Sequence, residues 1–192
     1  MQINDREKWN NKFRSGNYIN NKPAQVLTEN LHLLPQTGTA LDLACGLGAN
    51  AIFMAKRGLT THAWDTSDIA LDMLHATTKQ NGIRISIERK DIIKNPPSAE
   101  SFDVIIVSHF LERSIVSEII NALKKNGLLF YQTFTLNRLV DTGPRNMKYL
   151  LERNELLRLF TSLSVLHYIE YDQVGNLDSG NRNEAMLVAQ KM

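Results

Sequence analysis

Apolar and polar positions follow two different periods along the chain. Short runs such as 102–108 (FDVIIVS) are apolar at nearly every position, which is typical of strands that are covered on both faces. Between these runs, apolar residues recur every three or four positions, which predicts amphipathic helices. We expect strands at 39–44, 60–64, 83–89, 102–108, 128–134, 163–171 and 185–190. We expect helices at 23–34, 49–57, 68–80, 112–124 and 152–160.

The order of these elements predicts the architecture. Strands alternate with helices from 39 to 134, a pattern that favours a parallel sheet with helices on both faces. The last two expected strands are separated by a turn-rich stretch, 175–183, and by no helix. Adjacent strands joined in this way pair antiparallel. The sequence therefore predicts an α/β fold whose sheet is mixed and ends in a hairpin.

Length and charge narrow the class of protein. The chain has 192 residues, which favours a single domain, and we place it at 23–192. The first 22 residues are polar, and we expect them to form an N-terminal cap segment at 1–22. Its 22 basic and 20 acidic residues give a net charge of +2, which argues against a nucleic-acid partner. No apolar run reaches the ~20 residues of a membrane span, and the N-terminus lacks the apolar core of a secretory signal. We expect a cytoplasmic protein that is a monomer or a homodimer.

Cysteine and histidine usage limits the chemistry further. Cys45 is the single cysteine, so an intramolecular disulfide and a cysteine-rich zinc site are excluded. No pair of the 5 histidines has the spacing of a metal site on a helix or short loop, and we expect no metal.

A glycine-rich turn carries the strongest functional signal. In the segment LDLACGLGANA (41–51), Gly46 and Gly48 leave a predicted strand and enter a predicted helix, so the backbone can turn sharply and lie close to a ligand. The spacing also fits the dinucleotide fingerprint G-x-G-x-x-A. However, Asp42 ends the strand four residues before Gly46. A carboxylate there repels a pyrophosphate and suits a cationic ammonium or sulfonium group.

Two further carboxylates follow the next two predicted strands. Asp65 comes after 60–64, where it could accept hydrogen bonds from both hydroxyls of a ribose, and Asp91 follows 83–89, where it could accept from an adenine amino group. The carboxyl ends of parallel strands meet at one edge of the sheet, which is where ligands bind in open α/β sheets. As alternatives, Asp65 could cap the following helix, and Asp91 could form a surface ion pair with its basic neighbours.

At these residues the chain resembles the class I S-adenosylmethionine-dependent methyltransferases. Their signature D-x-x-x-G-x-G stands at 42–48, and the resemblance extends through FDVII (102–106) and LKKNGLL (123–129). It implies a Rossmann-like sheet of seven strands in the order 3-2-1-4-5-7-6, with the last strand antiparallel. It also implies that S-adenosylmethionine is the cofactor. The implied cofactor-binding residues are Asp42, Leu43, Ala44, Cys45, Gly46, Gly48, Asn50, Asp65, Thr66, Ser67, Asp91, Ile92, Ser108 and Phe110.

Within this class, the chain is similar to small bacterial methyltransferases of the tellurite-resistance type. The similarity rests on the segments WNNKF (9–13), YQTFT (131–135), GPRN (143–146) and LLERNELL (150–157). Some of those relatives carry Glu where Gln132 stands and Pro where Met147 stands. The resemblance implies a small-molecule acceptor, with an oxyanion such as tellurite as the specific hypothesis.

The acceptor side of the site is expected beyond the fourth strand. His109 lies where a catalytic base could reach the acceptor, or it could shape the pocket or bond the backbone. The segment Ser108–Leu111 lacks the Asn/Asp-Pro-Pro-Tyr element of amino methyltransferases, and Asn95–Ser98 precedes the strand. A basic lid that binds the acceptor, or else ordinary surface charge, is predicted from Lys12, Arg14, Arg113, Arg138 and Arg145. Tyr18 is a further expected contact of the acceptor.

Three other functions remain possible from the sequence. The acceptor could be a macromolecule such as a tRNA or a protein, although no strong basic patch favours this. The chain could also bind S-adenosylmethionine as a regulator without catalysis. An NAD-linked oxidoreductase is disfavoured by Asp42 and by the hairpin expected at the end of the sheet.

Overall fold

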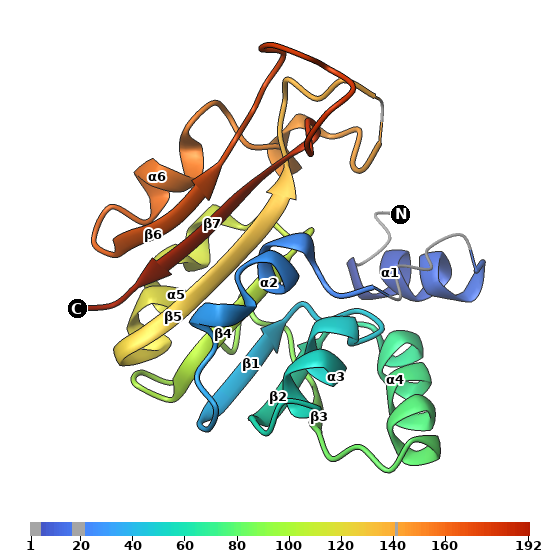
Figure 1. Ribbon diagram of the computed structural model, residues 1–192. Coiled ribbons are helices and arrows are strands. Elements are labelled where there is room, and N and C mark those ends of the chain that lie inside the picture. The colour runs from blue at the N-terminus through green and yellow to red at the C-terminus, as the bar shows by residue number, and fades with distance from the viewer. Residues whose placement is uncertain (1–4, 17–21, 141) are drawn as a thin grey trace.

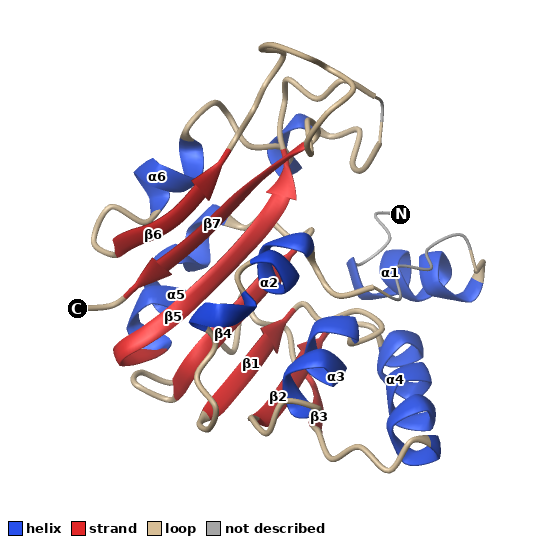
Figure 2. Ribbon diagram, in the orientation of Figure 1, coloured by secondary structure: helices blue, strands red, loops and turns tan. Residues whose placement is uncertain are grey.

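The central sheet of the protein has the strand order that the sequence predicts. A computed structural model describes residues 5–16, 22–140 and 142–192. Its sheet has 7 strands in the order β3-β2-β1-β4-β5-β7-β6 (Figure 2). The strands are β1 (Thr39–Leu43), β2 (Thr60–Asp65), β3 (Ser86–Arg89), β4 (Phe102–Ser108), β5 (Leu123–Phe134), β6 (Ser164–Ile169) and β7 (Glu184–Gln190).

Strand direction brings the predicted ligand-binding ends together. β1 pairs parallel with β2 and with β4, and β4 pairs parallel with β5. β7 is inserted between β5 and β6 and pairs antiparallel with both, which confirms the terminal hairpin. The carboxyl ends of β1, β2 and β4 therefore lie at one edge, and the beginning of β7 lies at that same edge.

Helices cover both faces of the sheet because alternate residues of its central strands are apolar on both sides. Val104 and Ile106 of β4 pack with α2 and α3, whereas Ile105 and Val107 pack in a second cluster with α5 and α6 (Figure 1). α4 packs beside α3 over β2. The helices are α1 (Asp5–Arg14), α2 (Gln25–Glu29), α3 (Ala49–Ala55), α4 (Asp68–Gln80), α5 (Val116–Ala122) and α6 (Glu155–Leu159). None of the described helices is long and apolar enough to cross a membrane.

Four of the five predicted helices are shorter in the structure, and the largest differences are at 23–34 and 112–124. The helix expected at 23–34 ends after Glu29, because Nδ2 of Asn30 donates to the backbone oxygen of Val26 and competes with the helical pattern. A 3-10 turn follows at Leu31–Leu33. The helix expected at 112–124 is a 3-10 turn at Arg113–Ile115 followed by α5, and Leu123 instead begins β5, where it is fully buried and pairs with Phe102.

The N-terminal segment, expected only as a cap, contains a helix. α1 lies beside the start of α4 (Figure 1), where Arg6 forms an ion pair with Asp68 and Oδ1 of Asn10 accepts a hydrogen bond from Oγ of Ser67 at 2.7 Å. Phe13 is buried. These contacts place the described part of the cap over the end of β2, while the domain boundary at residue 22 stays a prediction.

Candidate functional site

The glycine loop between β1 and α3 requires a left-handed backbone. Ala44, Gly46 and Gly48 have φ angles of 58°, 52° and 72°. A Cβ atom on Gly48 would lie 2.5 Å from the methyl carbons of Leu74, so only glycine fits. A Cβ atom on Gly46 would lie 3.3 Å from Phe13, so α1 covers this part of the loop. The loop is therefore held both by its own conformation and by helices packed around it.

The thiol of Cys45 is buried within this loop. Burial raises the pKa of Cys45, and the carboxylates of Asp42 and Asp65 raise it further. A thiol that stays protonated is a poor nucleophile, which agrees with the expectation that Cys45 fills space. Leu43 is likewise fully buried, so its side chain belongs to the core.

Asp42 is fully buried beneath the loop rather than directed into an open site. Its Oδ2 accepts a hydrogen bond from the backbone N–H of Ala51 at 2.9 Å, and its Oδ1 lies 3.5 Å from Nδ2 of Asn50. Burial raises the pKa of Asp42 to about 7, although these two hydrogen bonds oppose the shift. The sequence placed Asp42 against a bound ligand. In the structure the carboxylate holds the start of α3, and its role toward a ligand stays a prediction.

Asp65 joins the glycine loop to the turn after β2. Its two oxygens accept from the backbone N–H groups of Gly46 and Ser67, each at 2.8 Å. Burial raises its pKa against the effect of these hydrogen bonds. Each oxygen keeps a second lone pair, so a contact with ribose hydroxyls remains a prediction. Ser67 also caps α4, and Thr66 lies beside it in the same turn.

The charge around the loop fits a cationic ligand. Asp42 and Asp65 are buried, and among the described residues neither forms an ion pair with a basic side chain. Buried carboxylates without a countercharge are costly, and a nearby positive charge lowers that cost. The ammonium and sulfonium groups of S-adenosylmethionine supply such charge, so the residues present fit this cofactor.

Asp91 lies at the same edge but faces solvent. Its side chain is 42% exposed and forms an ion pair with Lys94 at 3.1 Å, rather than with the basic residues that precede it. Its Oδ1 also accepts from the backbone N–H of Ile93. Ile92 is buried in the core. A role of Asp91 and the Ile92 backbone toward an adenine stays a prediction.

The end of β4 is tied directly to the glycine loop. Oγ of Ser108 accepts a hydrogen bond from Nδ2 of Asn50 at 2.9 Å, and Oδ1 of Asn50 accepts from the backbone N–H of Ala24 at 2.8 Å. Asn50 therefore connects α2, α3 and β4. The backbone oxygen of Phe110 accepts from the hydroxyl of Tyr131 at 2.8 Å, which fixes the chain beyond β4.

His109 lies in this segment and has a partner that the sequence did not predict. Nε2 of His109 lies 3.0 Å from Oε1 of Glu184, and its ring lies 5.1 Å from that of Phe134. His109 also has a φ of 54°, in the left-handed region. Glu184 lies 75 positions away in the chain, and only the pairing of β5 with β7 brings it there. A histidine paired with a carboxylate can accept or donate a proton.

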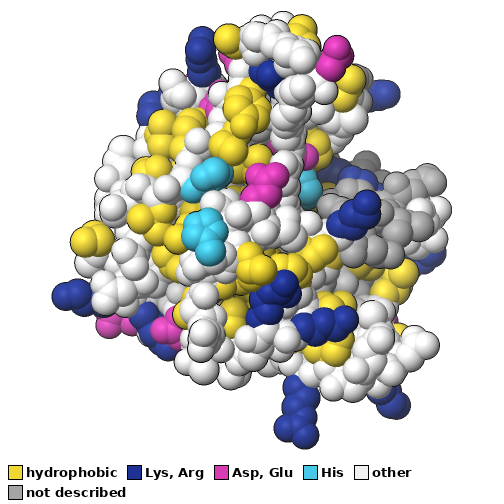
Figure 3. All heavy atoms as spheres, viewed as in Figure 1, with side chains coloured by type: hydrophobic (Ala, Val, Ile, Leu, Met, Phe, Trp, Pro, Cys, Tyr) yellow, Lys and Arg dark blue, Asp and Glu magenta, His cyan; other side chains and the backbone are white. Residues whose placement is uncertain are grey.

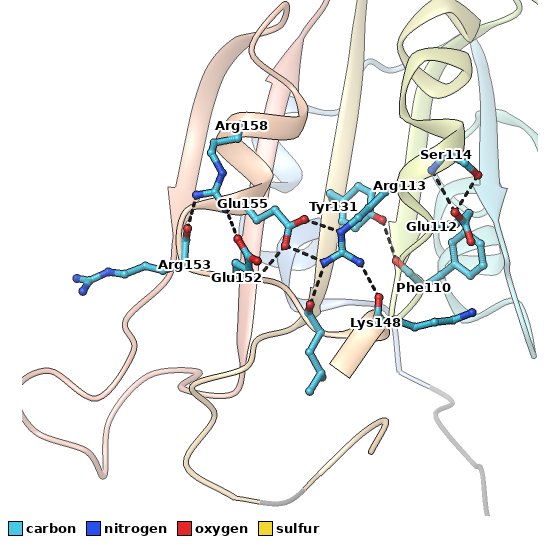
Figure 4. Close-up of polar contacts among 11 residues, drawn as sticks. Phe110, Glu112, Arg113, Ser114, Tyr131, Lys148, Glu152, Arg153, Glu155 and Arg158 are labelled. Atoms are coloured by element: carbon cyan, nitrogen blue, oxygen red, sulfur yellow. Dashed lines mark hydrogen bonds and ion pairs between the residues drawn. The ribbon is translucent and has the colours of Figure 1, made fainter. Parts of the chain in front are cut away.

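Arg113, which was predicted for the basic lid, already has protein partners in the structure. Its Nε and Nη2 atoms donate to the two carboxylate oxygens of Glu155 at 2.6 and 2.9 Å, and Nη1 donates to the backbone oxygen of Lys148 at 2.6 Å (Figure 4). The ion pair with Glu155 raises the pKa of Arg113. Its guanidinium therefore fastens α6 and the preceding loop to the segment after β4, and it is not available to an acceptor.

The other predicted acceptor residues lie on separate segments. Arg14 is exposed and donates to Asn11 within α1, and Arg145 is exposed in the loop 136–149. Arg138 is half-buried in that same loop. Tyr18 lies outside the described residues. Their role toward an acceptor stays a prediction. The described residues contain no group of three His, Cys, Asp or Glu side chains that could hold a metal ion.

Comparisons with known proteins agree with this geometry. Residues 40–127 match the family model of a methyltransferase domain. The "Probable S-adenosyl-L-methionine-dependent methyltransferase TehB" of Haemophilus influenzae is 27% identical over 152 residues, which cover 74% of this chain and 52% of that protein. An "Uncharacterized protein" of the same organism is 32% identical over 104 residues, which cover 49% of this chain and 41% of that protein. The chain thus spans about half the length of these curated relatives.

Solved structures show the same fold. The crystal structure of TehB from Haemophilus influenzae has a TM-score of 0.69 at 23% identity and covers 87% of this chain and 61% of that one. A SAM-dependent methyltransferase from Methanosarcina mazei has a TM-score of 0.70 at 15% identity and covers 89% and 99% of the two chains. The strand order and the match over 40–127 support a class I methyltransferase domain, and the chain resembles TehB.

Proposed function

We propose that this methyltransferase domain binds S-adenosylmethionine and transfers its methyl group to a small-molecule acceptor. The observation that carries the proposal is the pair of buried carboxylates, Asp42 and Asp65, which flank a left-handed glycine loop and have no basic partner among the described residues. The family match over 40–127 includes this loop. A cationic ligand is the one that such a site stabilises.

Each part of the site has a distinct task toward the cofactor, which supplies an electrophilic methyl group. The backbone around Gly46 and Gly48 lies against the methionine part, and Asp65 accepts from the ribose. Asp91 and the Ile92 backbone contact the adenine, with Thr66 at the ribose end. Ser108 and Phe110 border the place of transfer. The chain contributes mainly by aligning the acceptor and excluding water.

The net charge and the face of the molecule shown in Figure 3 favour a small acceptor over a nucleic acid. Among the described residues on the face shown in Figure 3, Lys and Arg side chains are dispersed and form no continuous basic patch. The net charge of +2 is also small for a protein that binds phosphate backbones. Methylation of a tRNA or protein is therefore the secondary hypothesis, and a regulator without catalysis is a further one.

An oxyanion such as tellurite is the specific acceptor that the resemblance suggests. Bidentate arginine contacts recognise oxyanions well, and Arg138 and Arg145 of the loop 136–149 are the candidates for them. Arg113 gives no support, because its donors are taken by Glu155 and the backbone. Tellurite and selenite therefore belong in the acceptor screen beside thiols, halides and small amines.

Binding and turnover test the proposal separately. Calorimetry should detect S-adenosylmethionine and S-adenosylhomocysteine but neither NAD nor NADP. Asp65→Ala should weaken cofactor binding about 10- to 150-fold, because hydrogen bonds to a charged group contribute ~1.5–3 kcal/mol. The exposed Asp72→Ala on α4 is the matched control. Release of S-adenosylhomocysteine is then measured across the acceptor screen. Binding without turnover on any acceptor favours the regulator, and binding of NAD instead refutes the proposal.

A further inference from the structure

A chain of hydrogen bonds leads from the backbone of α2 to the ring of His109. The backbone N–H of Val26 donates to Oε1 of Gln132 at 2.7 Å, since the first turn of a helix leaves its N–H groups without helical partners. Nε2 of Gln132 donates to Oε2 of Glu184, and Oε1 of Glu184 lies 3.0 Å from Nε2 of His109. Segments that are distant in the sequence thus meet beside the end of β4.

The backbone N–H of Val26 fixes the direction of every hydrogen bond that follows it toward His109. A backbone N–H can only donate, so Gln132 presents its amide oxygen to Val26 and its NH₂ group to Glu184. An ionised Glu184 can only accept. A neutral ring of His109 must then donate from Nε2, and its Nδ1 carries the lone pair.

Glu184 is ionised at neutral pH although it is largely buried. Its side chain is 12% exposed. Burial alone would raise the pKa of Glu184, but hydrogen bonds from His109, Gln132 and Asn181 outweigh that effect and hold the pKa below its usual range. The carboxylate therefore stays available as an acceptor for Nε2–H of His109.

The remaining nitrogen of His109 is open to a ligand. Within the described residues, Nδ1 makes no hydrogen bond, and it is not among the buried polar atoms that lack a partner. The residue before it, Ser108, is bonded to Asn50 at the start of α3. The ring of Phe134 and the left-handed backbone at His109 hold the imidazole in place. His109 directly follows the end of β4, so the free lone pair lies at the same edge of the sheet as the glycine loop.

We propose that Glu184, oriented by Gln132, is the positioning residue that keeps Nδ1 of His109 as the base for an acceptor that arrives with its proton. This rests on the proposed function and names its acceptor class, a neutral hydroxyl or thiol. The heteroatom of the acceptor bonds to the methyl carbon while the sulfur–carbon bond breaks and leaves its electron pair on sulfur. The proton passes to Nδ1, and the imidazolium replaces the sulfonium as the positive charge.

The same geometry disfavours an acceptor that arrives as an oxyanion. A buried carboxylate close to the acceptor raises the energy of a second negative charge there. Arg113, which lies in the same segment as His109, is already neutralised by Glu155. An acceptor that is neutral until its proton leaves avoids this repulsion.

The isosteric variant Glu184→Gln tests the positioning role without an acceptor. In this variant the amide oxygen takes the place of Oε2, because Gln132 and Asn181 both donate there. Its NH₂ group then faces His109, so Nε2 must accept and the ring proton moves to Nδ1. Isotope-edited NMR of the ring nitrogens at about pH 8, where histidine is normally neutral, reports the tautomer directly.

The expected result is an Nε2–H ring in the wild type and in the control variant Glu29→Gln, whose carboxylate is exposed on α2. The expected ring in Glu184→Gln is Nδ1–H. An Nδ1–H ring in the wild type, or the same tautomer in both proteins, overturns the proposal. This measurement does not depend on cofactor binding or turnover.

Turnover with two thiols then tests the base. Ethanethiol is mostly protonated at this pH and needs a base, whereas thiophenol is mostly ionised and does not. We expect His109→Ala to lower kcat for ethanethiol about 10²- to 10⁴-fold, and Glu184→Gln at least about tenfold, with KM and S-adenosylhomocysteine affinity unchanged. In His109→Ala, thiophenol should react at the wild-type rate. Equal losses for both thiols overturn the proposal. If the tautomers are as expected but the wild-type protein methylates no acceptor, the result refutes the proposed function and not the positioning role of Glu184.

Discussion

Replacing Asp42 by asparagine should stabilise the ligand-free protein at alkaline pH. Asp42 is fully buried, and burial raises its pKa to about 7 from the ordinary value of 3.8. The folded protein therefore holds a proton on Asp42 at pH values where the unfolded chain has lost it. The contribution of protonated Asp42 to the free energy of unfolding is fully present below pH ~4 and is lost progressively as pH rises through about 7.

The size of the effect follows from the shift. About three pKa units correspond to roughly 4 kcal/mol of stability lost by pH ~8. The introduced asparagine would keep the acceptor for Ala51, but its NH₂ group would face Nδ2 of Asn50, an unpaired donor that costs ~1–3 kcal/mol. The net gain at pH ~8 is about 2 kcal/mol, or roughly 4–8 °C in Tm for a chain of this size. Near pH 5 most of this loss of stability in the wild type has not yet occurred, so we expect Asp42→Asn to be almost no more stable than wild type there.

Urea denaturation at a series of pH values measures this difference. The exposed Asp72→Asn serves as the matched control, because every other titrating group then cancels between variant and wild type. Asp42→Asn should also bind S-adenosylmethionine more weakly, since it removes negative charge beneath the glycine loop. Two stability curves that remain parallel from pH ~5 to ~8 would refute the assignment of a raised pKa. A variant that is less stable than wild type at pH ~8 would show that the amide cannot fit.

Three further results are expected. Ala44→Gly should stabilise the protein by about 1 kcal/mol, seen as a Tm higher by roughly 2–4 °C, because alanine has an unfavourable left-handed backbone there and glycine does not; an unchanged or lower Tm contradicts this. Arg113→Ala should lower the free energy of unfolding by roughly 1–3 kcal/mol through the unpaired Glu155, with acceptor KM unchanged in the folded fraction; a raised KM at wild-type stability contradicts it. Removal of residues 1–16 should lower the rate of turnover while Tm falls only slightly, because α1 covers Gly46 and, among its described residues, buries only Phe13; a large fall in Tm contradicts that.

The parts of the fold that the sequence predicts are those set by local pattern. Continuous apolar runs identified the central strands, and the missing helix before β7 identified the hairpin. Element ends were predicted less well, because single side chains decide them. Asn30 ends α2 through a bond to the backbone of Val26, and Leu123 leaves α5 to pair with Phe102 in the sheet.

The cofactor side and the acceptor side of the site also differ in how well the sequence predicts them. The glycine loop, Asp42 and Asp65 lie at the ends of consecutive strands, so residue type and spacing were enough to bring them together. The partner of His109 depends instead on the register between β5 and β7, in which Phe134 lies opposite Glu184. No local signal marks that glutamate, although an acidic residue at the start of the final strand, across from the residue after β4, is a pattern that could be searched for.

This difference bears on what a family match can transfer. The match over 40–127 covers the glycine loop and His109 but ends before Gln132 and Glu184. The residues proposed to set the proton position on His109 therefore lie outside the matched part of the chain. A glutamate at 132 would keep the bond to Val26 but would bring a second carboxylate against Glu184, which only a shared proton could relieve.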